Sequence, residues 1–133
     1  MTAVEKYFFT PIYYPRSAWS VVRWWESRRS LFNISVGITG LVSLGSITAL
    51  AHLPPSPDSF SPPWAGVLVY GVLANLFYTM GAPTDLFLRR LLGPRAAAVG
   101  PVLFRYGFVF SLGLTLLPIP VALLDWVLRI FLW

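Results

Sequence analysis

The chain has 133 residues, of which 56% are hydrophobic and only 11% are charged, and its mean hydropathy is +0.68. Soluble domains carry about 25% charged residues, so this composition excludes an ordinary soluble domain and favours a protein embedded in a bilayer. The formal net charge is +5, but arginines flanking membrane spans explain it better than nucleic-acid binding does. The absence of cysteine excludes disulfides, thiolate metal sites and a cysteine nucleophile.

We predict one all-α integral membrane domain with three transmembrane helices. An amphipathic interfacial helix is expected on its N-terminal side, and a short interfacial helix at its C-terminus. In chain order the predicted parts are an interfacial arm and helix (1–30), a first crossing (31–53), a proline-rich outside loop (54–63), a second crossing (64–88), a basic inside loop (89–98), a third crossing (99–117) and an interfacial tail (118–133).

Residues 1–16 are rich in aromatic side chains, and we expect them to be non-helical because each proline there favours extended geometry in the residue before it. From Ser17 onward, apolar residues recur at helical spacing beside a basic face, which predicts a helix lying in the membrane interface. The aromatic residues expected at an interface are Tyr13, Tyr14, Trp19, Trp24 and Trp25. Anchoring among lipid headgroups and docking of a partner both remain open for them.

The first crossing carries small residues that would let another helix approach closely. These are Gly37, Gly40, Gly45 and Ala49. His52 lies at the exit, and no second histidine exists to complete a metal site with it. The loop that follows has five prolines in ten residues and no Lys or Arg, so it is expected on the outside.

A stripe of small and polar residues runs along the second crossing at intervals of three and four. Its members are Gly71, Asn75, Tyr78, Ala82 and Asp85, with Thr79 beside them. Asn75 is expected near the middle of the bilayer, where its amide must be satisfied within the bundle. The expected partners are hydroxyl groups of Thr39, Ser43 and Ser46 in the first crossing or of Ser111 in the third.

The third crossing repeats small residues every four positions, at Gly107, Ser111 and Thr115. Arg105 lies about 9 Å into this helix, where a charge must either snorkel to the inner headgroups or pair with an acid. Asp85 is the candidate partner for that pair, and it can also pair with Arg89 at i+4.

The sequence has no P-loop, GxGxxG, HExxH, GxSxG or CxxC motif, so we expect a protein that is not an enzyme. No motif in the sequence implies a cofactor, and lipids or pigments could be bound through partner subunits. A non-catalytic accessory subunit of a larger membrane complex, for example an energy-converting or photosynthetic one, is the function we expect. A small homo-oligomeric transporter or channel is the alternative.

Three groups of residues form a recognisable pattern along most of residues 13–118. They are Trp24-Trp25-Glu26 with Arg28-Arg29 and Phe32-Asn33, then Ala74-Asn75 with Tyr78-Thr79 and Gly81, then Gly100-Pro101 with Leu103-Phe104 and Gly107. This pattern resembles that of small bacterial multi-pass membrane proteins of no known activity. The resemblance implies a multi-pass helical fold in the bacterial inner membrane.

The arginines also predict the orientation of the chain. Arginines lie before residue 30 and at 89–95, whereas no Lys or Arg lies between Ser30 and Leu88. Basic loops stay in the cytoplasm, so the N-terminus is expected inside and the C-terminus in the periplasm. Expected partners are therefore membrane lipids and other membrane subunits, with a homo-oligomer as the other arrangement.

Overall fold

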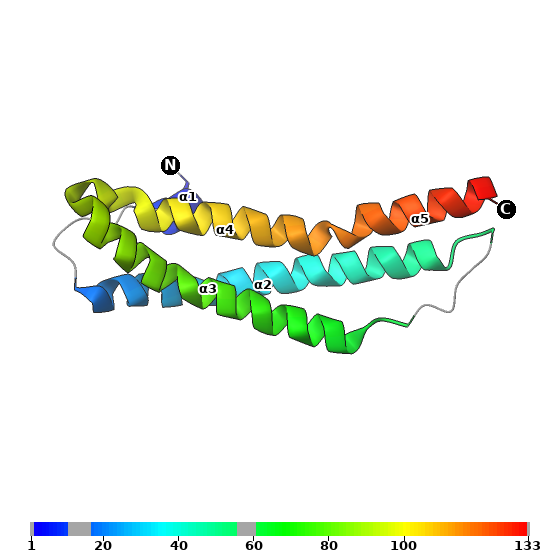
Figure 1. Cartoon of the computed structure of the whole chain (residues 1–133), viewed down its shortest axis with the longest axis horizontal. Coiled ribbons are helices and arrows are strands. Elements are labelled where there is room, and N and C mark those ends of the chain that lie inside the picture. The colour runs from blue at the N-terminus through cyan, green and yellow to red at the C-terminus, as the bar shows by residue number, and fades with distance from the viewer. Residues whose placement is uncertain (1, 11–16, 56–60, 133) are drawn as a thin grey trace.

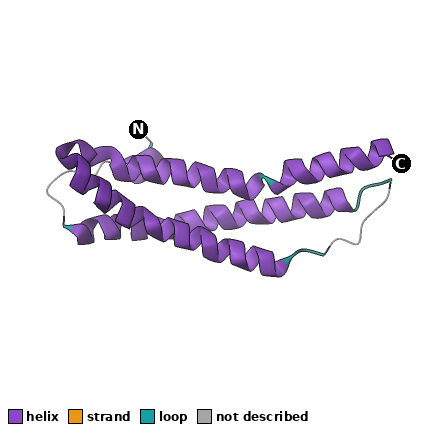
Figure 2. Cartoon of the chain, in the orientation of Figure 1, coloured by secondary structure: helices purple, strands orange, loops and turns teal. Residues whose placement is uncertain are grey.

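The computed structural model describes residues 2–10, 17–55 and 61–132, and all regular structure in these ranges is helical (Figure 2). The elements are α1 (Ala3–Phe9), α2 (Ala18–Ala51), α3 (Trp64–Leu92), the 3-10 helix η1 (Gly93–Ala98), α4 (Val99–Leu116) and α5 (Pro118–Leu132). Three segments are long and apolar enough to cross a membrane: Ala18–Ala51, Trp64–Leu92 and Arg95–Leu132. The predicted all-α fold with three such helices is confirmed at this level.

The helices form an elongated bundle (Figure 1). α2 and the α4–α5 rod run in the same direction, and α3 runs antiparallel to both. α2 contacts α3, α4 and α5, and α3 contacts α4. The turn between α3 and α4 therefore lies at the same end of the bundle as the start of α2.

The prediction of a non-helical N-terminal arm was wrong for Ala3–Phe9, which form α1. The Thr2 hydroxyl accepts a hydrogen bond from the Glu5 amide at 3.2 Å, and the Glu5 carboxylate accepts one from the Thr2 amide at 2.7 Å. Such a capping box stabilises a first turn, and the helix ends before the residue preceding Pro11. α1 is held to α2 by Arg28, which donates to the Tyr7 carbonyl and lies 4.7 Å from the Tyr7 ring centre.

The predicted boundary between an interfacial helix and the first crossing does not exist as a break in the chain. α2 is one helix of 34 residues, about 51 Å long at 1.5 Å per residue. Its N-cap is Ser17, whose hydroxyl accepts from the Ser20 amide at 3.3 Å. No proline interrupts it, so its amphipathic first half continues straight into the apolar second half.

The second crossing and the basic loop after it are more helical than predicted. α3 runs from Trp64, as expected, through Pro83 and on to Leu92. Gly93 ends it with a φ of +56°, a conformation that glycine adopts at no steric cost. η1 then fills the rest of the predicted loop, so the connection to α4 is a compact helical turn.

The predicted tail is indeed a helix, α5, but it does not leave the bundle. It continues α4 after Leu117 and packs along the C-terminal half of α2 (Figure 1). The Trp126 indole donates to the Pro54 carbonyl at 3.0 Å, and Arg129 donates to the Leu50 carbonyl at 3.1 Å. These bonds hold α5 to the end of α2.

The buried core is a cluster of aromatic rings at the arginine-rich end of the bundle. Its members are Val21, Trp24, Trp25, Phe32, Val36, Tyr78, Ala82 and Phe104. Trp25 meets Tyr78 and Phe104 edge-on, with ring centres 5.6 and 5.9 Å apart. Edge-to-face pairs of this kind add about 0.5–1.5 kcal/mol each beyond the area they bury.

Gly81 is the point where α3 comes closest to Trp25. A Cβ atom added there would lie 2.4 Å from the Trp25 ring, which is only 4% exposed. We expect Gly81→Ala to destabilise the fold by about 1–3 kcal/mol, because a buried indole in a packed cluster cannot move aside without strain. Reversible unfolding in detergent micelles measures the change.

The matched control is Gly71→Ala on the same helix, where a Cβ atom meets nothing within 4 Å. It should be neutral or stabilising by up to about 1 kcal/mol, through helix propensity alone. Equal effects of the two substitutions would contradict the close packing of Trp25 on Gly81.

Candidate functional site

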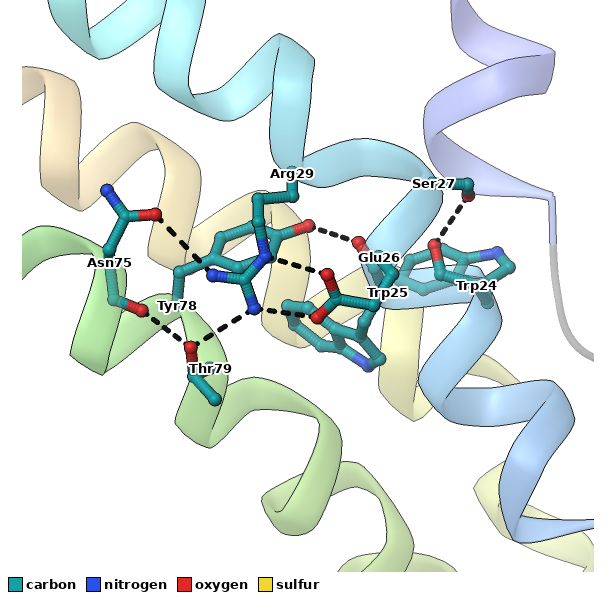
Figure 3. A network of polar contacts seen from close by, with 8 residues as sticks. All are labelled: Trp24, Trp25, Glu26, Ser27, Arg29, Asn75, Tyr78 and Thr79. Carbon is teal, nitrogen blue, oxygen red and sulfur yellow. Dashed lines mark hydrogen bonds and ion pairs between the residues drawn. The ribbon is translucent and has the colours of Figure 1, made fainter.

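A polar network joins α2 to α3 around Arg29 (Figure 3). Its guanidinium donates to the Glu26 carboxylate at 2.6 and 2.8 Å and to the Thr79 hydroxyl at 3.1 Å. The guanidinium carbon lies 5.1 Å from the Tyr78 ring centre, a cation–π distance. Arg29 thus connects α2 to the polar stripe of α3.

Asn75 is satisfied inside the bundle, but the expected partners were wrong. Its amide nitrogen donates to the Gly71 carbonyl at 3.1 Å, and its oxygen accepts from Arg29 at 3.5 Å (Figure 3). A bond to its own helix and one to a long arginine side chain replace the predicted hydroxyl partners. Tyr78 donates to the Trp25 carbonyl at 2.6 Å.

The predicted stripe on α3 does face the bundle, most tightly at its arginine-rich end. Tyr78, Ala82 and Asp85 are buried, Gly71 and Asn75 are half-buried, and Thr79 is exposed at the edge. The spacing of three and four places these residues on one side of α3, which packs into the bundle at Tyr78, Ala82 and Asp85.

Asp85 is a fully buried carboxylate with 0% exposure. It accepts from the Arg89 Nε at 2.7 Å and from the Trp25 indole at 3.2 Å. Gly100 of α4 packs directly on it, since a Cβ atom there would lie 2.6 Å from the carboxylate. A buried charge needs such pairing, because either ion left alone would be strongly penalised.

The predicted pair of Asp85 with Arg105 is therefore wrong, and the i+4 pair with Arg89 is right. Both oxygens of Asp85 face groups on α2 and on its own helix, whereas the Arg105 side chain is exposed. Position i+4 brings Arg89 onto the same face of α3 at no cost in helix geometry.

The small-residue stripe of α4 is buried only at its far end. Thr115 is buried, lies 3.8 Å from where a Gly40 Cβ would stand, and bonds the Tyr70 hydroxyl at 2.5 Å. Ser111 is half-buried, and its carbonyl accepts from Tyr70 at 3.3 Å. Gly107 is exposed with nothing within 4 Å of its Cβ position.

The five interface aromatics separate into different roles. Trp19 is 71% exposed, as an interface residue should be. Trp24 and Trp25 are 9% and 4% exposed and belong to the core, because α3 and α4 cover the face of α2 that carries them. Tyr13 and Tyr14 lie outside the described residues.

An apolar groove of about 400 Å³ lies between α3 and α4, with Trp25 and Phe32 of α2 lining it. Its walls are formed on α3 by Tyr70, Leu73, Ala74, Phe77, Tyr78, Met80, Gly81 and Thr84, and on α4 by Leu103, Phe104, Gly107, Phe108, Phe110, Ser111 and Leu114. Ligand pockets commonly measure about 300–1,000 Å³. No pattern in the sequence predicts this groove, because its width depends on the distance between α3 and α4.

Sequence reasoning also missed the roles of Arg29, Gly81 and Gly100. A signal for the first exists, since Trp25, Arg29 and Phe32 follow the spacing of four and three that defines one helix face. The two glycines carry no such signal, because only the position of a neighbouring helix shows why a side chain is excluded.

Comparison of the chain with protein families, curated proteins and solved structures finds no match. Among the described residues, no group of three His, Asp or Glu side chains is placed to hold a metal ion.

The buried pair gives a direct test of the site. We expect Asp85→Asn to lower the free energy of unfolding by roughly 3–5 kcal/mol, because Arg89 keeps its charge and loses the carboxylate. Asp125→Asn is the matched control, since Asp125 is 65% exposed and lies 3.3 Å from Arg129 at the same i+4 spacing.

The control should change stability by no more than about 1 kcal/mol. Thermal and denaturant unfolding in one detergent compare the two variants. A loss of stability in Asp85→Asn no larger than in Asp125→Asn would contradict a structural role for the buried pair.

Proposed function

We propose that this chain is a non-catalytic accessory subunit of a larger membrane protein complex. The observation that carries the proposal is an uncovered face of α2 made of small and branched residues. This glycine face consists of Ile34, Gly37, Leu41, Gly45 and Ala49, all exposed. Small residues along a helix in lipid let a second helix approach closely.

The chain's own helices leave this face open. Helical residues advance about 100° each, so Leu41 points away from the buried Phe32 and Val36 on the other side of α2. Nothing lies within 4 Å of a Cβ atom at Gly37 or Gly45. In contrast, Gly40 packs against Thr115 of α4.

We propose that the hydrocarbon layer lies between two polar levels of the bundle. Arg28 and Arg29 mark one level, and His52 marks the other. The stretch of α2 between Ser30 and Ala51 is about 32 Å long, matching a hydrocarbon core of about 30 Å. The aromatic core around Trp25 then lies at headgroup depth.

In this placement the third crossing consists of α4 and α5 together. From Arg105 to Asp125 the α4–α5 rod rises about 30 Å, whereas α4 alone would end halfway. The arginine-rich end faces the cytoplasm of a bacterium, with the N-terminus inside and the C-terminus outside.

Because the chain has no cysteine, single cysteines report this orientation without background. We expect Ser61→Cys to react with a membrane-impermeant maleimide in intact spheroplasts. Arg90→Cys should react only after permeabilisation. Both positions are exposed. The reverse pattern would overturn the orientation, and labelling of both from outside would contradict the proposed crossings.

The alternative is a small homo-oligomeric transporter or channel. Its polar path would need Asn75, Tyr78, Thr79 and Asp85, and each of these bonds to groups within the same chain. Because these side chains already form hydrogen bonds within the chain, a role in helix packing is favoured over a polar path. Ion flux in liposomes, lost in an Asn75→Leu variant that still folds, would favour the transporter.

The subunit proposal is tested by affinity purification from native membranes in a mild detergent, followed by native mass measurement. We expect a co-purifying membrane protein whose recovery falls about tenfold in Gly45→Leu, equal to about 1.4 kcal/mol. The leucine has room in the free chain and would separate the two helices in a complex.

Gly113→Leu is the matched control, because Gly113 is exposed on α4 and also has nothing within 4 Å. It should leave the recovery unchanged. A monomer with no co-purifying chain would contradict the subunit proposal, and a homodimer lost in Gly45→Leu would reassign the glycine face to self-association.

A further inference from the structure

We propose that the groove between α3 and α4 holds one acyl chain of an anionic phospholipid from the leaflet at the arginine-rich end. This site is separate from the glycine face of α2. Trp25 and Phe32, which line the groove, lie on the opposite side of α2 from Leu41. The inference therefore does not depend on a partner subunit.

The groove offers almost only carbon to an occupant. The two tyrosines in its wall have their hydroxyls engaged: Tyr70 bonds to Thr115 and to the Ser111 carbonyl, and Tyr78 donates to the Trp25 carbonyl. The Thr84 hydroxyl donates to the Met80 carbonyl of its own helix. A polar ligand would lose its bonds to water without replacing them, so an apolar occupant is favoured.

The dimensions of the groove suit a single acyl chain. Its walls extend from Tyr70 to Thr84 on α3 and from Leu103 to Leu114 on α4, about 21 and 16 Å. Spread over this length, 400 Å³ corresponds to a mean cross-section of roughly 20–25 Å².

The groove also has the depth of one leaflet. Half of a hydrocarbon core of about 30 Å is roughly 15 Å, close to the length of the groove on α4. One end, at Thr84 and Trp25, lies beside the Asp85–Arg89 pair. The other end, at Tyr70 and Leu114, lies about halfway along the bundle. An acyl chain would therefore enter with its headgroup at the Asp85–Arg89 end.

Charge at that end selects an anionic headgroup. Of the Lys and Arg residues that the structure describes, all except Arg129 lie in α1, the first half of α2, or the α3–η1–α4 end. They are Lys6, Arg23, Arg28, Arg29, Arg89, Arg90, Arg95 and Arg105. Glu5, Glu26 and Asp85 offset only part of this charge. Basic clusters at a membrane surface attract anionic lipids.

Native mass measurement of the purified full chain tests the proposal with two lipids of identical acyl chains, a phosphatidylglycerol and a phosphatidylcholine. We expect one retained phosphatidylglycerol per chain, bound at least about threefold more than the phosphatidylcholine. Gly107→Leu should reduce this adduct at least about fivefold, because the new side chain has nothing within 4 Å except the space of the groove.

Gly113→Leu serves again as the control, since Gly113 is on the same helix, equally open, and not in the groove wall. It should keep the adduct. The unaltered chain gives a second measurement that does not depend on any variant: a phosphatidylglycerol with a photoreactive acyl chain should crosslink to groove residues such as Met80 and Leu114 rather than to Leu41.

Four outcomes would overturn the proposal. Equal retention of both lipids would contradict the selection of an anionic headgroup. An adduct that survives in Gly107→Leu, or crosslinks confined to the glycine face of α2, would place the lipid elsewhere. Loss of a dimer in Gly107→Leu with the adduct unchanged would make the groove a contact between two copies of the chain.

Discussion

The approach of Trp25 to Gly81 is the contact on which the rest of the bundle depends. Without a side chain at Gly81, the indole packs against α3 at this position and reaches Asp85 with its ring nitrogen. The backbone carbonyl of the same tryptophan accepts from Tyr78. One residue of α2 thus fixes the register of α3 at three points. Arg29 then lies level with Asn75 and Thr79, as its hydrogen bonds require.

The polar groups of the bundle follow from this register. In an apolar environment a polar side chain must find a partner within the protein, and the described helices provide one in two ways. Short side chains such as Thr79 and Thr84 bond back to their own helix. Longer ones, such as Arg29 and Tyr70, cross to a neighbouring helix. These bonds between helices occur around Arg29, around Thr115 and at Arg129 near the end of α5. The groove between α3 and α4 lies in the half of the bundle that contains the first two.

Periodicity predicted the helices and the inner face of α3, because both depend on local spacing alone. It also predicted Asp85 with Arg89, since an i+4 pair needs no knowledge of other helices. Trp24 and Trp25 were predicted at an interface but are buried in the core. The sequence pattern of an aromatic helix face is the same whether that face meets lipid headgroups or another helix. α1 could have been predicted, since Thr2 and Glu5 form a visible capping box before Pro11. The partners of Asn75 could not have been predicted, because they depend on the register between α2 and α3.

The position of the aromatic core has a thermodynamic consequence. In the placement we propose, Val21, Trp24 and Trp25 of the core lie at the headgroup level, whereas Phe32, Val36 and the helices further along lie among lipid tails. Apolar contacts within hydrocarbon release no water, but contacts at the surface do. The hydrophobic effect would then stabilise helix association at the arginine-rich end, and close packing of side chains would stabilise it along the rest of the bundle. Separation of its arginine-rich end should carry a positive heat-capacity change, and separation of the rest should not.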